Sequence, residues 1–469
     1  MAVIKFGTDG WRAIIAKEYT TDNVARVAVA TALWVKRNMK HQAVVIGHDC
    51  RFGGKMFAET TAKIIANNGI KVYLHEGIAT TPMISLATKE LQASLGVVIT
   101  ASHNPPEYNG YKLKAHFGGP MLPENITEVE KLIPAEHGLI LDQLSMDQLI
   151  ANEQIEIIDL EALYIEKIKA NFDLESIRNA EMGFAYDAMF GAGQEVMKNL
   201  LPNLTFMNAE LNPGFHGVAP EPIHRNLEPF SKMIAESNGA IACGLATDGD
   251  ADRIGLYDEK GRFIDSHHII LLLIKYLVEI KKMSGKVVVA FSVSPKVAKL
   301  CKHYGLPLEV VPVGFKHVAK IMVNEDVLLG GEESGGIAIK GHIPERDGLW
   351  IGLTIWEYMV KSGKKLSELI DEVYEIVGPF AFERIDLHLT ESKKQTVMTN
   401  CIEGAYKEFG TYSVQNTESV DGFKYYFEDE QWVMIRPSGT EPVLRTYAES
   451  KDSKSAFDIL KATHKTFGA

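Results

Sequence analysis

The chain has 469 residues, of which 46% are hydrophobic and 23% are charged, and its formal net charge is −12. This length exceeds what one hydrophobic core usually serves, so about three domains are expected. Nucleic-acid backbones and anionic membrane surfaces require a basic face, so the acidic balance argues against both as general partners. Any anionic ligand must therefore be bound by local basic groups.

The composition does not point to secretion or to a membrane. Residues 1–10 lack the apolar segment of a signal peptide, and the most apolar run, residues 269–280, is too short and too charged to span a bilayer. The four cysteines lie far apart and form no Cys-x-x-Cys pair, so neither a zinc knuckle nor a disulfide framework is indicated. We expect a cytoplasmic protein without a membrane partner.

Short apolar runs alternate with longer amphipathic stretches, which is typical of an α/β fold. In chain order, the pattern predicts a strand at residues 43–49, a helix at 53–69 and a strand at 71–76. Strand–helix units of the same kind are predicted at residues 286–305 and 308–323. Polar stretches near residues 141–156 and 362 indicate the first and last domain boundaries.

Four apolar strands at separate places along the chain are each followed at once by a polar segment, and three of these four segments contain glycine. The four loops are TASHN at 100–104, DGDADR at 248–253, EESGG at 332–336 and RPSGTEP at 436–442. In open α/β sheets, ligands bind beyond the carboxyl ends of strands. The pattern therefore predicts four domains placed around one shared cleft.

The DGDADR loop places Asp248, Asp250 and Asp252 at alternate positions, which can bring three carboxylates onto one cation. Oxygen ligands of this kind suit magnesium or calcium rather than zinc. An EF-hand is an alternative because Glu259 falls at the twelfth position, but Arg253 stands where an EF-hand needs glycine. An acidic surface turn is the other alternative, although three carboxylates without a cation or basic partners repel one another.

The other two loops offer groups that bind phosphate and sugar. Arg436 supplies a bidentate guanidinium, Ser438 and Thr440 supply hydroxyls, and Gly439 frees backbone N–H groups, which together suit a phosphate. Glu332 and Ser334 suit the vicinal hydroxyls of a sugar, and Arg12 in the N-terminal FGTDGWR could approach a phosphorylated serine. A plain hairpin or a solvated turn remains the alternative for each of these loops taken alone.

Ser102 and His103 stand side by side at the end of a predicted buried strand. A hydrolase dyad would need the imidazole to face the hydroxyl, whereas adjacent residues of an extended segment point to opposite sides. A serine opposite three aspartates and several arginines is better explained as a phosphoryl carrier. A phosphoserine would add an oxygen to the metal shell, and the metal would offset the accumulated negative charge.

The four loops, in this order, resemble the signature loops of the α-D-phosphohexomutases, and FGTDGWR is similar to the N-terminal motif of that family. The resemblance covers essentially the whole chain and implies a heart-shaped, four-domain protein. Three related α/β domains with mixed sheets flanked by helices would precede an α+β domain that resembles the TATA-box-binding protein. We place these domains at residues 1–150, 151–254, 255–365 and 366–469.

The resemblance implies a role for each matching residue. Ser102 would be the phosphoserine, and its phosphate would bind magnesium together with Asp248, Asp250 and Asp252. The remaining implied residues are Arg12 and Arg253 at the same site, Lys112 as an acid or base, Lys316 for orienting the substrate, Glu332 and Ser334 for the sugar, and Arg436, Ser438, Gly439 and Thr440 for the distal phosphate.

The chain departs from the family at the acid–base position. The phosphomannomutase/phosphoglucomutase and phosphoglucosamine mutase branches carry histidine where this chain has Gly336. The phosphoglucomutase pattern instead uses a lysine in a later HIREKDG-like stretch, and this chain has Arg346 there, in HIPERDG. Arginine stays protonated in proteins, so the general base is left open, with His342 as a substitute.

The resemblance implies an isomerase that interconverts hexose 1-phosphate and hexose 6-phosphate through a phosphoserine and a hexose 1,6-bisphosphate. The sugar is expected to be glucose first, then mannose or glucosamine. Expected cofactors are Mg²⁺ and hexose 1,6-bisphosphate as activator, and the partner is a small phosphosugar rather than nucleic acid. A metal-dependent phosphatase and a catalytically silent sugar-phosphate-binding protein are the alternatives, and the sequence leaves monomer and homodimer open.

Overall fold

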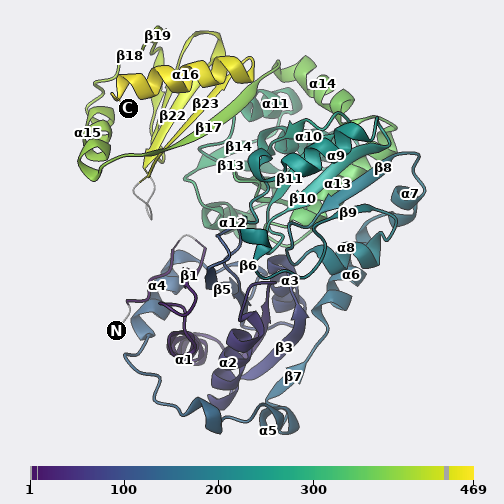
Figure 1. Ribbon diagram of the computed structural model, residues 1–469, viewed down its shortest axis with the longest axis vertical. Helices are drawn as coiled ribbons and strands as arrows, with labels where there is room; N and C mark the ends of the chain where they lie inside the picture. Colours follow the sequence, from purple (N-terminus) through teal and green to yellow (C-terminus); the bar gives the residue numbers. More distant parts are fainter. Residues whose placement is uncertain (1–2, 8, 438–442, 469) are drawn as a thin grey trace. The chain divides into compact units, whose positions relative to one another are not determined.

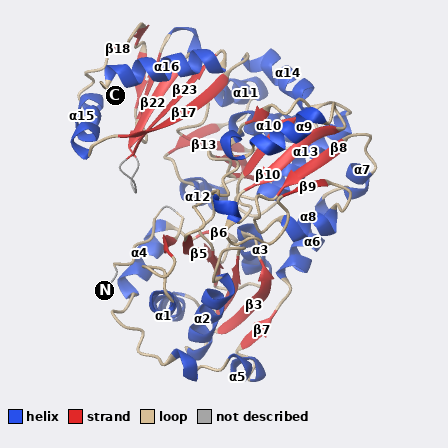
Figure 2. Ribbon diagram, in the orientation of Figure 1, coloured by secondary structure: helices blue, strands red, loops and turns tan. Residues whose placement is uncertain are grey.

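The computed structural model describes residues 3–7, 9–437 and 443–468, and the chain divides into two compact units. The large unit contains Met1–Val288 and Gly314–Ile370, and the small unit contains Val289–Val313 and Asp371–Ala469. The division falls inside one strand, β13 (Lys286–Ala290), and inside one helix, α14 (Leu366–Val377). Figures 1 and 2 show helices and strands alternating along the chain, and the predicted α/β class is confirmed.

The first sheet of the large unit is mixed. Its strand order is β1-β5-β4-β2-β3-β7, with β6 paired to β5. Strands β4, β2, β3 and β7 run parallel, whereas β5 is antiparallel to β4 and β1 is antiparallel to β5. The strands are β1 (Trp11–Ile14), β2 (Ala43–His48), β3 (Lys71–Ile78), β4 (Leu95–Ile99), β5 (Tyr108–Ala115), β6 (Gly119–Pro120) and β7 (Ile155–Ile157).

Helices accompany this sheet and explain the composition of its central strands. Strands β2 and β4 are buried at every position, as expected for parallel strands covered on both faces. Helix α1 is capped by the side chain of Thr20, which accepts from the amide of Asn23. The helices are α1 (Thr21–Asn38), α2 (Gly54–Asn67), α3 (Thr81–Glu90), α4 (Pro123–Leu132) and α5 (Met146–Ala151), with a short 3-10 turn at Leu141–Gln143.

The second sheet repeats the same plan, with parallel strands followed by antiparallel ones. Its order is β12-β11-β10-β8-β9, in which β10, β8 and β9 are parallel and β11 and β12 are antiparallel additions. Its strands are β8 (Gly183–Asp187), β9 (Thr205–Met207), β10 (Ile241–Thr247), β11 (Ile254–Asp258) and β12 (Phe263–Ile264). Its helices are α6 (Leu160–Asn171), α7 (Leu174–Arg178), α8 (Gln194–Leu200) and α9 (Glu228–Glu236), with 3-10 turns at Phe215–Gly217 and His224–Asn226.

The third αβ region begins at the end of the second. In the large unit it contains α10 (Ser266–Glu279), α12 (Phe315–Asn324), β15 (Val327–Gly331), β16 (Ile337–Ile339) and α13 (Gly348–Ser362), and β15 pairs with β16 antiparallel. The segment that belongs to the small unit carries α11 (Lys296–Tyr304) and β14 (Leu308–Val311). The strand–helix units predicted at residues 286–305 and 308–323 are therefore present.

The C-terminal part of the small unit is an antiparallel sheet with the order β17-β23-β22-β21-β20. Figure 1 shows α16, in yellow, lying along this sheet. Strand β22 alternates its side chains: Val433 and Ile435 join the core with α16, whereas Trp432 and Met434 pack with Phe291 on the other face. The elements are β17 (Ala381–His388), α15 (Glu391–Ile402), β18 (Glu408–Phe409), β19 (Tyr412–Ser413), β20 (Asn416–Glu418), β21 (Phe423–Tyr426), β22 (Trp432–Pro437), β23 (Val443–Ser450) and α16 (Ser453–Thr466), with a 3-10 turn at Glu428–Glu430.

Each of the four predicted loops connects two strands that pair antiparallel. The pairs are β4 with β5, β10 with β11, β15 with β16, and β22 with β23. In the first two sheets the loop leaves the carboxyl end of a strand that is parallel to its other neighbour. The first two predicted loops therefore occupy equivalent places in two sheets of the same plan, which explains why the same sequence pattern recurs there.

The structure bears on two features that were not expected from the sequence, a membrane-spanning helix and a disulfide. Among the described residues, no helix combines the length and apolar character needed to cross a membrane. All four cysteines are buried free thiols, so the structure places none of them in a disulfide.

Candidate active site

Three of the four predicted loops meet inside the large unit. We call them the serine loop (residues 100–107), the aspartate loop (residues 248–253) and the glutamate loop (residues 332–336). The amide of Ile254, next to the aspartate loop, donates to the carbonyl of Gly335 (3.1 Å), and the amide of Thr81 donates to the carbonyl of Asp250 (3.0 Å). A Cβ on Gly249 would lie 2.5 Å from the carbonyl oxygen of Ser102, so glycine permits the aspartate and serine loops to touch.

Ser102 is buried and sits in a left-handed conformation, with φ of 55°. Its hydroxyl donates to Asp248 Oδ2 at 2.7 Å, and its amide donates to the hydroxyl of Thr100 at 2.9 Å. His103 Nδ1 lies 3.4 Å from the same hydroxyl. The expectation of an extended segment with opposed side chains is wrong here, because the chain turns at Ser102. The shorter contact orients the hydroxyl toward Asp248.

His103 lies in a positive environment. Burial, followed by the charges of Arg253, Arg12, Lys112 and Arg51, lowers the pKa of His103 well below its ordinary value. The imidazole is therefore neutral at physiological pH. The same cations make this region attractive to a phosphate.

The three aspartates fit a hard divalent cation. Their carboxylates are fully buried, and one ligand atom from each lies within 4.8 Å of the others. Asp248 Oδ1 accepts the amides of Asp252 and Arg253, at 3.0 and 3.1 Å. Among the described residues, Asp250 Oδ1 and Asp252 Oδ1 have no hydrogen-bond partner, and Arg253 Nε lies 3.9 Å from the latter. Buried carboxylate oxygens left in this way suit magnesium or calcium.

The aspartates differ electrostatically. Burial, followed by repulsion from Asp250 and Asp252, raises the pKa of Asp248 well above its ordinary range. Burial also opposes the charge of Asp250, but the Lys112 ammonium and the hydrogen bonds from Lys112 and Thr81 outweigh it and lower that pKa. A bound cation would relieve the repulsion at Asp248, so metal binding and ionisation of this carboxyl are coupled.

Two buried cations contact Asp250 and Asp252 through the carboxylate oxygens that are not left unpartnered. Lys112 Nζ lies 2.7 Å from Asp250 Oδ2, 3.1 Å from Asp252 Oδ2 and 2.9 Å from Asp9 Oδ2. Arg346 Nη2 lies 2.6 Å from Asp252 Oδ2 and 2.5 Å from Asp9 Oδ2. Burial disfavours the Lys112 charge, but the three carboxylates outweigh it and raise the pKa of Lys112. Lys112 is therefore an ammonium in this arrangement.

The charged residues of the HIPERDG segment make buried contacts. Glu345 accepts from Lys114 at 2.8 Å, and Asp347 accepts from the Tyr164 hydroxyl at 2.7 and 2.8 Å. His342 Nε2 lies 2.9 Å from Asp347 Oδ2, and its ring stacks on Trp350 with 3.7 Å between ring centres. These contacts hold His342 against the start of α13, which gives it a packing role.

Arg51 is a residue that the sequence analysis missed. Its guanidinium donates to four backbone carbonyls of the serine loop and its end: Ser102 and Asn104 at 2.6 Å, Pro105 at 2.8 Å and Tyr108 at 3.0 Å. Arg51 Nε also lies 3.4 Å from Asp49 Oδ2, and burial raises the pKa of Asp49 to about 6. The available signal was HDCR, a further polar segment directly after a buried strand.

Replacing Arg51 by alanine should strongly destabilise the serine loop. The substitution leaves Asp49 buried without its cation and removes the donors of several carbonyls, a loss of about 3–5 kcal/mol. For a unit of more than 300 residues we expect the midpoint of thermal unfolding to fall by roughly 4–7 °C. Calorimetry measures this shift. Arg51→Lys should lose less stability than Arg51→Ala, because lysine keeps the charge. It should still be less stable than the wild type, because it lacks the planar guanidinium.

Arg178 offers a matched control for this experiment. It is exposed, and its guanidinium donates to a single carbonyl, that of Leu200. Arg178→Ala should therefore shift the midpoint by about 1–2 °C at most. Equal shifts for Arg51→Ala and Arg178→Ala would contradict the conclusion that Arg51 stabilises the serine loop.

The remaining predicted residues of the large unit surround the same loops. Arg12 Nη1 donates to Asn104 Oδ1 of the serine loop at 2.6 Å. Glu332 accepts the amide of Gly314 at 2.8 Å, and burial raises the pKa of this carboxyl. Ser334 is partly buried in the glutamate loop, and Lys316 lies in the first turn of α12, two residues after Gly314.

The fourth predicted loop belongs to the small unit. Arg436 ends the described part of β22 with Pro437, and its Nε donates to Asp421 Oδ2 at 3.0 Å. The same carboxylate oxygen accepts the amide of Val313, also at 3.0 Å. The other predicted members of this loop, Ser438, Gly439 and Thr440, lie outside the described residues.

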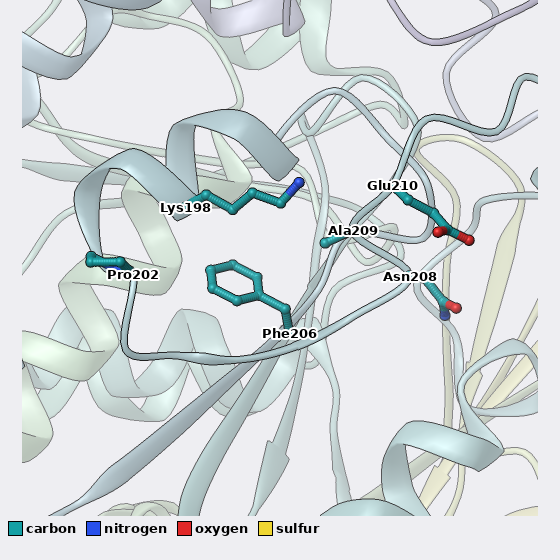
Figure 3. Close-up of a pocket in the computed structure, with 6 residues that line it drawn as sticks. All are labelled: Lys198, Pro202, Phe206, Asn208, Ala209 and Glu210. Atoms are coloured by element: carbon teal, nitrogen blue, oxygen red, sulfur yellow. The ribbon is translucent and has the colours of Figure 1, made fainter.

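A separate pocket of about 610 Å³ lies in the second sheet region, beside α8 and β9. Figure 3 shows Lys198 and Phe206 on either side of its opening, with Asn208 and Glu210 along one edge. None of its lining residues belongs to the predicted loops, so this pocket is distinct from the site described above.

Comparison with known proteins places this arrangement in a family. Residues 3–138, 162–261 and 265–377 match the alpha/beta/alpha domains I, II and III of phosphoglucomutase/phosphomannomutase, and residues 389–464 match its C-terminal domain. The phosphoglucomutase/phosphomannomutase of Thermococcus kodakarensis is 32% identical over 463 residues, which cover 97% of this chain and 96% of that protein. The phosphoglucosamine mutase of Methanocaldococcus jannaschii is 31% identical over 97% of this chain and 96% of its own length.

A solved structure agrees with these matches. The crystal structure of a provisionally assigned phosphomannomutase from Thermus thermophilus has a TM-score of 0.88 and 31% identity, and the alignment covers 100% of both chains. The matches define the class: a four-domain phosphohexomutase, which is an isomerase of the intramolecular phosphotransferase type. The chain belongs to the phosphoglucomutase/phosphomannomutase family. The predicted family and enzyme class are thereby confirmed.

Proposed function

We propose that the enzyme interconverts hexose 1-phosphate and hexose 6-phosphate through a phosphoserine at Ser102. The observation that carries this proposal is the contact of the Ser102 hydroxyl with Asp248, beside two buried aspartate oxygens without partners among the described residues. A divalent cation bound there would offset the negative charge of a phosphate on Ser102. Magnesium fits best, because all three side chains offer hard oxygen ligands.

The reaction needs two phosphoryl transfers. Phospho-Ser102 transfers its phosphoryl group to the free hydroxyl of the hexose monophosphate: the bond from Ser102 Oγ to phosphorus breaks, the bond from the sugar oxygen to phosphorus forms, and the proton of the sugar hydroxyl ends on Ser102 Oγ. The product is a hexose 1,6-bisphosphate, which turns over and returns its other phosphate to Ser102. Free hexose 1,6-bisphosphate would then act as activator, because it phosphorylates enzyme that has lost its phosphate.

The surrounding side chains have distinct proposed roles. Lys112 and Arg253 supply positive charge where phosphoryl oxygens gather, and Arg12 approaches the serine loop through Asn104. Lys112 is held as an ammonium by three carboxylates, which raise its pKa, so charge stabilisation suits it better than accepting or releasing a proton. Lys316 would orient the substrate from the start of α12.

Sugar recognition is assigned to the glutamate loop. The carboxylate of Glu332 and the hydroxyl of Ser334 would bind vicinal hydroxyls of the hexose. We propose glucose phosphate as the first substrate, followed by mannose and glucosamine phosphates. The names of similar proteins include both phosphoglucomutase/phosphomannomutase and phosphoglucosamine mutase, so relative rates on the four 1-phosphates of glucose, mannose, glucosamine and N-acetylglucosamine decide this point.

A coupled assay tests the reaction itself. Formation of hexose 6-phosphate from hexose 1-phosphate, stimulated by catalytic hexose 1,6-bisphosphate, supports the mutase. Release of inorganic phosphate without isomerisation would instead indicate a phosphatase, in which water reaches the phosphoserine. Binding of the sugar phosphate with neither product would indicate a silent binding protein.

The Arg436 loop is proposed to bind the phosphate that is not being transferred, in both orientations of the substrate. A mutase must accept the 1-phosphate and the 6-phosphate at one distal site, and a guanidinium with nearby hydroxyls and amides recognises phosphate without reading the sugar. Losing a charge-assisted contact costs roughly 1.5–3 kcal/mol, or about 10- to 150-fold in binding. Arg436→Ala should therefore raise KM for hexose 1-phosphate and hexose 6-phosphate by similar factors.

Steady-state kinetics in both directions measures this effect. Arg384→Ala is the matched control: Arg384 lies on β17 of the same sheet and is held by Asp386 at 2.7 and 2.8 Å. We expect this control to leave both KM values near those of the wild type. A change in KM for only one of the two substrates after Arg436→Ala would show that no shared distal site exists.

A further inference from the structure

The Arg346 side chain fills the space that a side chain at position 336 would need. A Cβ on Gly336 would lie 2.3 Å from Arg346 Cδ and 3.0 Å from Arg346 Cγ. Both atoms belong to the stem of the arginine, so moving the tip of the side chain alone would not relieve the overlap. Any side chain at position 336 therefore has to displace the Arg346 side chain from its present position.

Two carboxylates, those of Asp9 and Asp252, hold the Arg346 side chain in its present position. This side chain is 5% exposed, and its Nη2 contacts Asp252 Oδ2 and Asp9 Oδ2, the same two oxygens that Lys112 contacts. Two cations and two carboxylate oxygens thus form a closed group of four. Because Asp252 Oδ2 is held in this group, Asp252 Oδ1 is the oxygen left without a hydrogen-bond partner among the described residues.

The backbone supports the same geometry. Gly336 forms an isolated antiparallel bridge with Arg253, and its carbonyl accepts the amide of Glu332 at 3.0 Å. Farther along the chain, two residues after Arg346, the amide of Gly348 donates to the carbonyl of Ala251 in the aspartate loop at 2.9 Å. The segments that carry positions 336 and 346 are therefore both hydrogen-bonded to the aspartate loop or its end.

We propose that Arg346 is a positioning residue for phosphoryl transfer: it reaches Asp252 and Asp9 through the space that Gly336 leaves open, so the two positions work as a pair. The inference rests on the proposed function of the site. Arg346 holds Asp252 Oδ2 and thereby fixes which oxygen of Asp252 faces the ligand. Groups that orient metal ligands typically change metal affinity or activity by about 10- to 100-fold.

A double-mutant cycle tests the pair with Gly336→Ala, Arg346→Ala and the combination. The φ of Gly336 lies outside the left-handed region, so alanine adds side-chain volume without a backbone penalty. Each single substitution should lower kcat about 10- to 100-fold, with KM for the hexose phosphate within about threefold. The double variant should be no worse than Arg346→Ala alone, because the space for the added methyl group is then free.

Metal affinity gives a readout that does not depend on turnover. Titration of Mn²⁺ onto the wild type and the variants, without any sugar phosphate, should show about 10- to 100-fold weaker binding in both single variants. Arg346→Lys, which keeps a cation, should restore part of both kcat and Mn²⁺ affinity. Gly214→Ala is the control for glycine substitution, since a Cβ there meets no atom nearer than 3.4 Å.

Several outcomes would overturn the proposal. Arg346→Ala with kcat and Mn²⁺ affinity both within about threefold of the wild type would show that Arg346 does not position the aspartates. If the fold-losses in kcat of the two single variants multiply in the double variant, positions 336 and 346 act independently and do not form a pair. If Gly336→Ala fails to fold by thermal unfolding, Arg346→Ala and Arg346→Lys still decide the role of Arg346. If the wild type has no mutase activity, the proposed function fails, while the Mn²⁺ titrations still test the positioning.

Discussion

Ser102→Ala should abolish isomerisation, with kcat reduced by at least about 10⁴-fold, because removal of a nucleophile costs that much or more in enzymes that form a covalent intermediate. The substitution removes the oxygen that would carry the phosphate and leaves the fold intact, since the lost hydroxyl makes its short contact only with Asp248. Intact-mass measurement should show one phosphate on the wild type after incubation with hexose 1,6-bisphosphate. The same phosphate should be missing from the variant.

Ser94→Ala is the control for this experiment. Ser94 is a buried serine of the same sheet region, and its hydroxyl has no hydrogen-bond partner within the part of the chain that the structure describes. Its replacement should leave both activity and phosphorylation unchanged. A fully active Ser102→Ala enzyme, or a phosphate that remains on that variant, would refute the assignment of the phosphoserine.

Removal of divalent metal should lower turnover by roughly 10³-fold, because a bound cation contributes several kcal/mol to stabilising transferred charge. Asp250→Asn should cause a comparable loss. Asp250 Oδ2 accepts from Lys112 and from the Thr81 hydroxyl. In asparagine the NH₂ group would either replace Oδ2 and meet these two donors, or replace Oδ1 and face the cation. Chelation followed by Mg²⁺ addition, together with Mn²⁺ titration of the variant, measures both effects.

Asp187→Asn separates a metal effect from a general effect of losing a buried carboxylate. Asp187 ends β8 in the same sheet as the aspartate loop, and it accepts the amide of Met189 and the side chain of Asn208. This control should keep its Mn²⁺ affinity. Unchanged turnover after chelation, with metal removal verified by elemental analysis, would contradict the requirement for a cation.

The sequence predicted the loops well because each loop follows a buried strand, and an apolar run that ends in polar residues is a local signal. The predictions for the aspartates, Ser102 and Glu332 all rest on this signal, and the first two of these loops follow strands of sheets with the same plan. Local signals of this kind also gave the α/β class, including the strand at residues 43–49 and the helix that follows it.

The partners of these loops could not be predicted because they come from distant parts of the chain. Asp9 meets Arg346 across 337 positions, and Arg51 reaches the serine loop from the end of a different strand. Nothing in a single sequence indicates which arginine will be buried. The turn at Ser102 was missed for a related reason: a non-glycine residue with positive φ has no reliable sequence signal.

The small unit is assembled from two segments that are separated in the chain, and this has a consequence during synthesis. Phe291 leaves the ribosome 141 residues before Trp432, on which it packs, and Lys424 lies between the two rings, 4.8 Å and 4.3 Å from their centres. At about 5–20 residues per second, this interval lasts roughly 7–28 s. During that time the nascent chain exposes an apolar segment whose partner has not been translated, so the last quarter of the protein must be complete before residues 289–313 reach their folded environment.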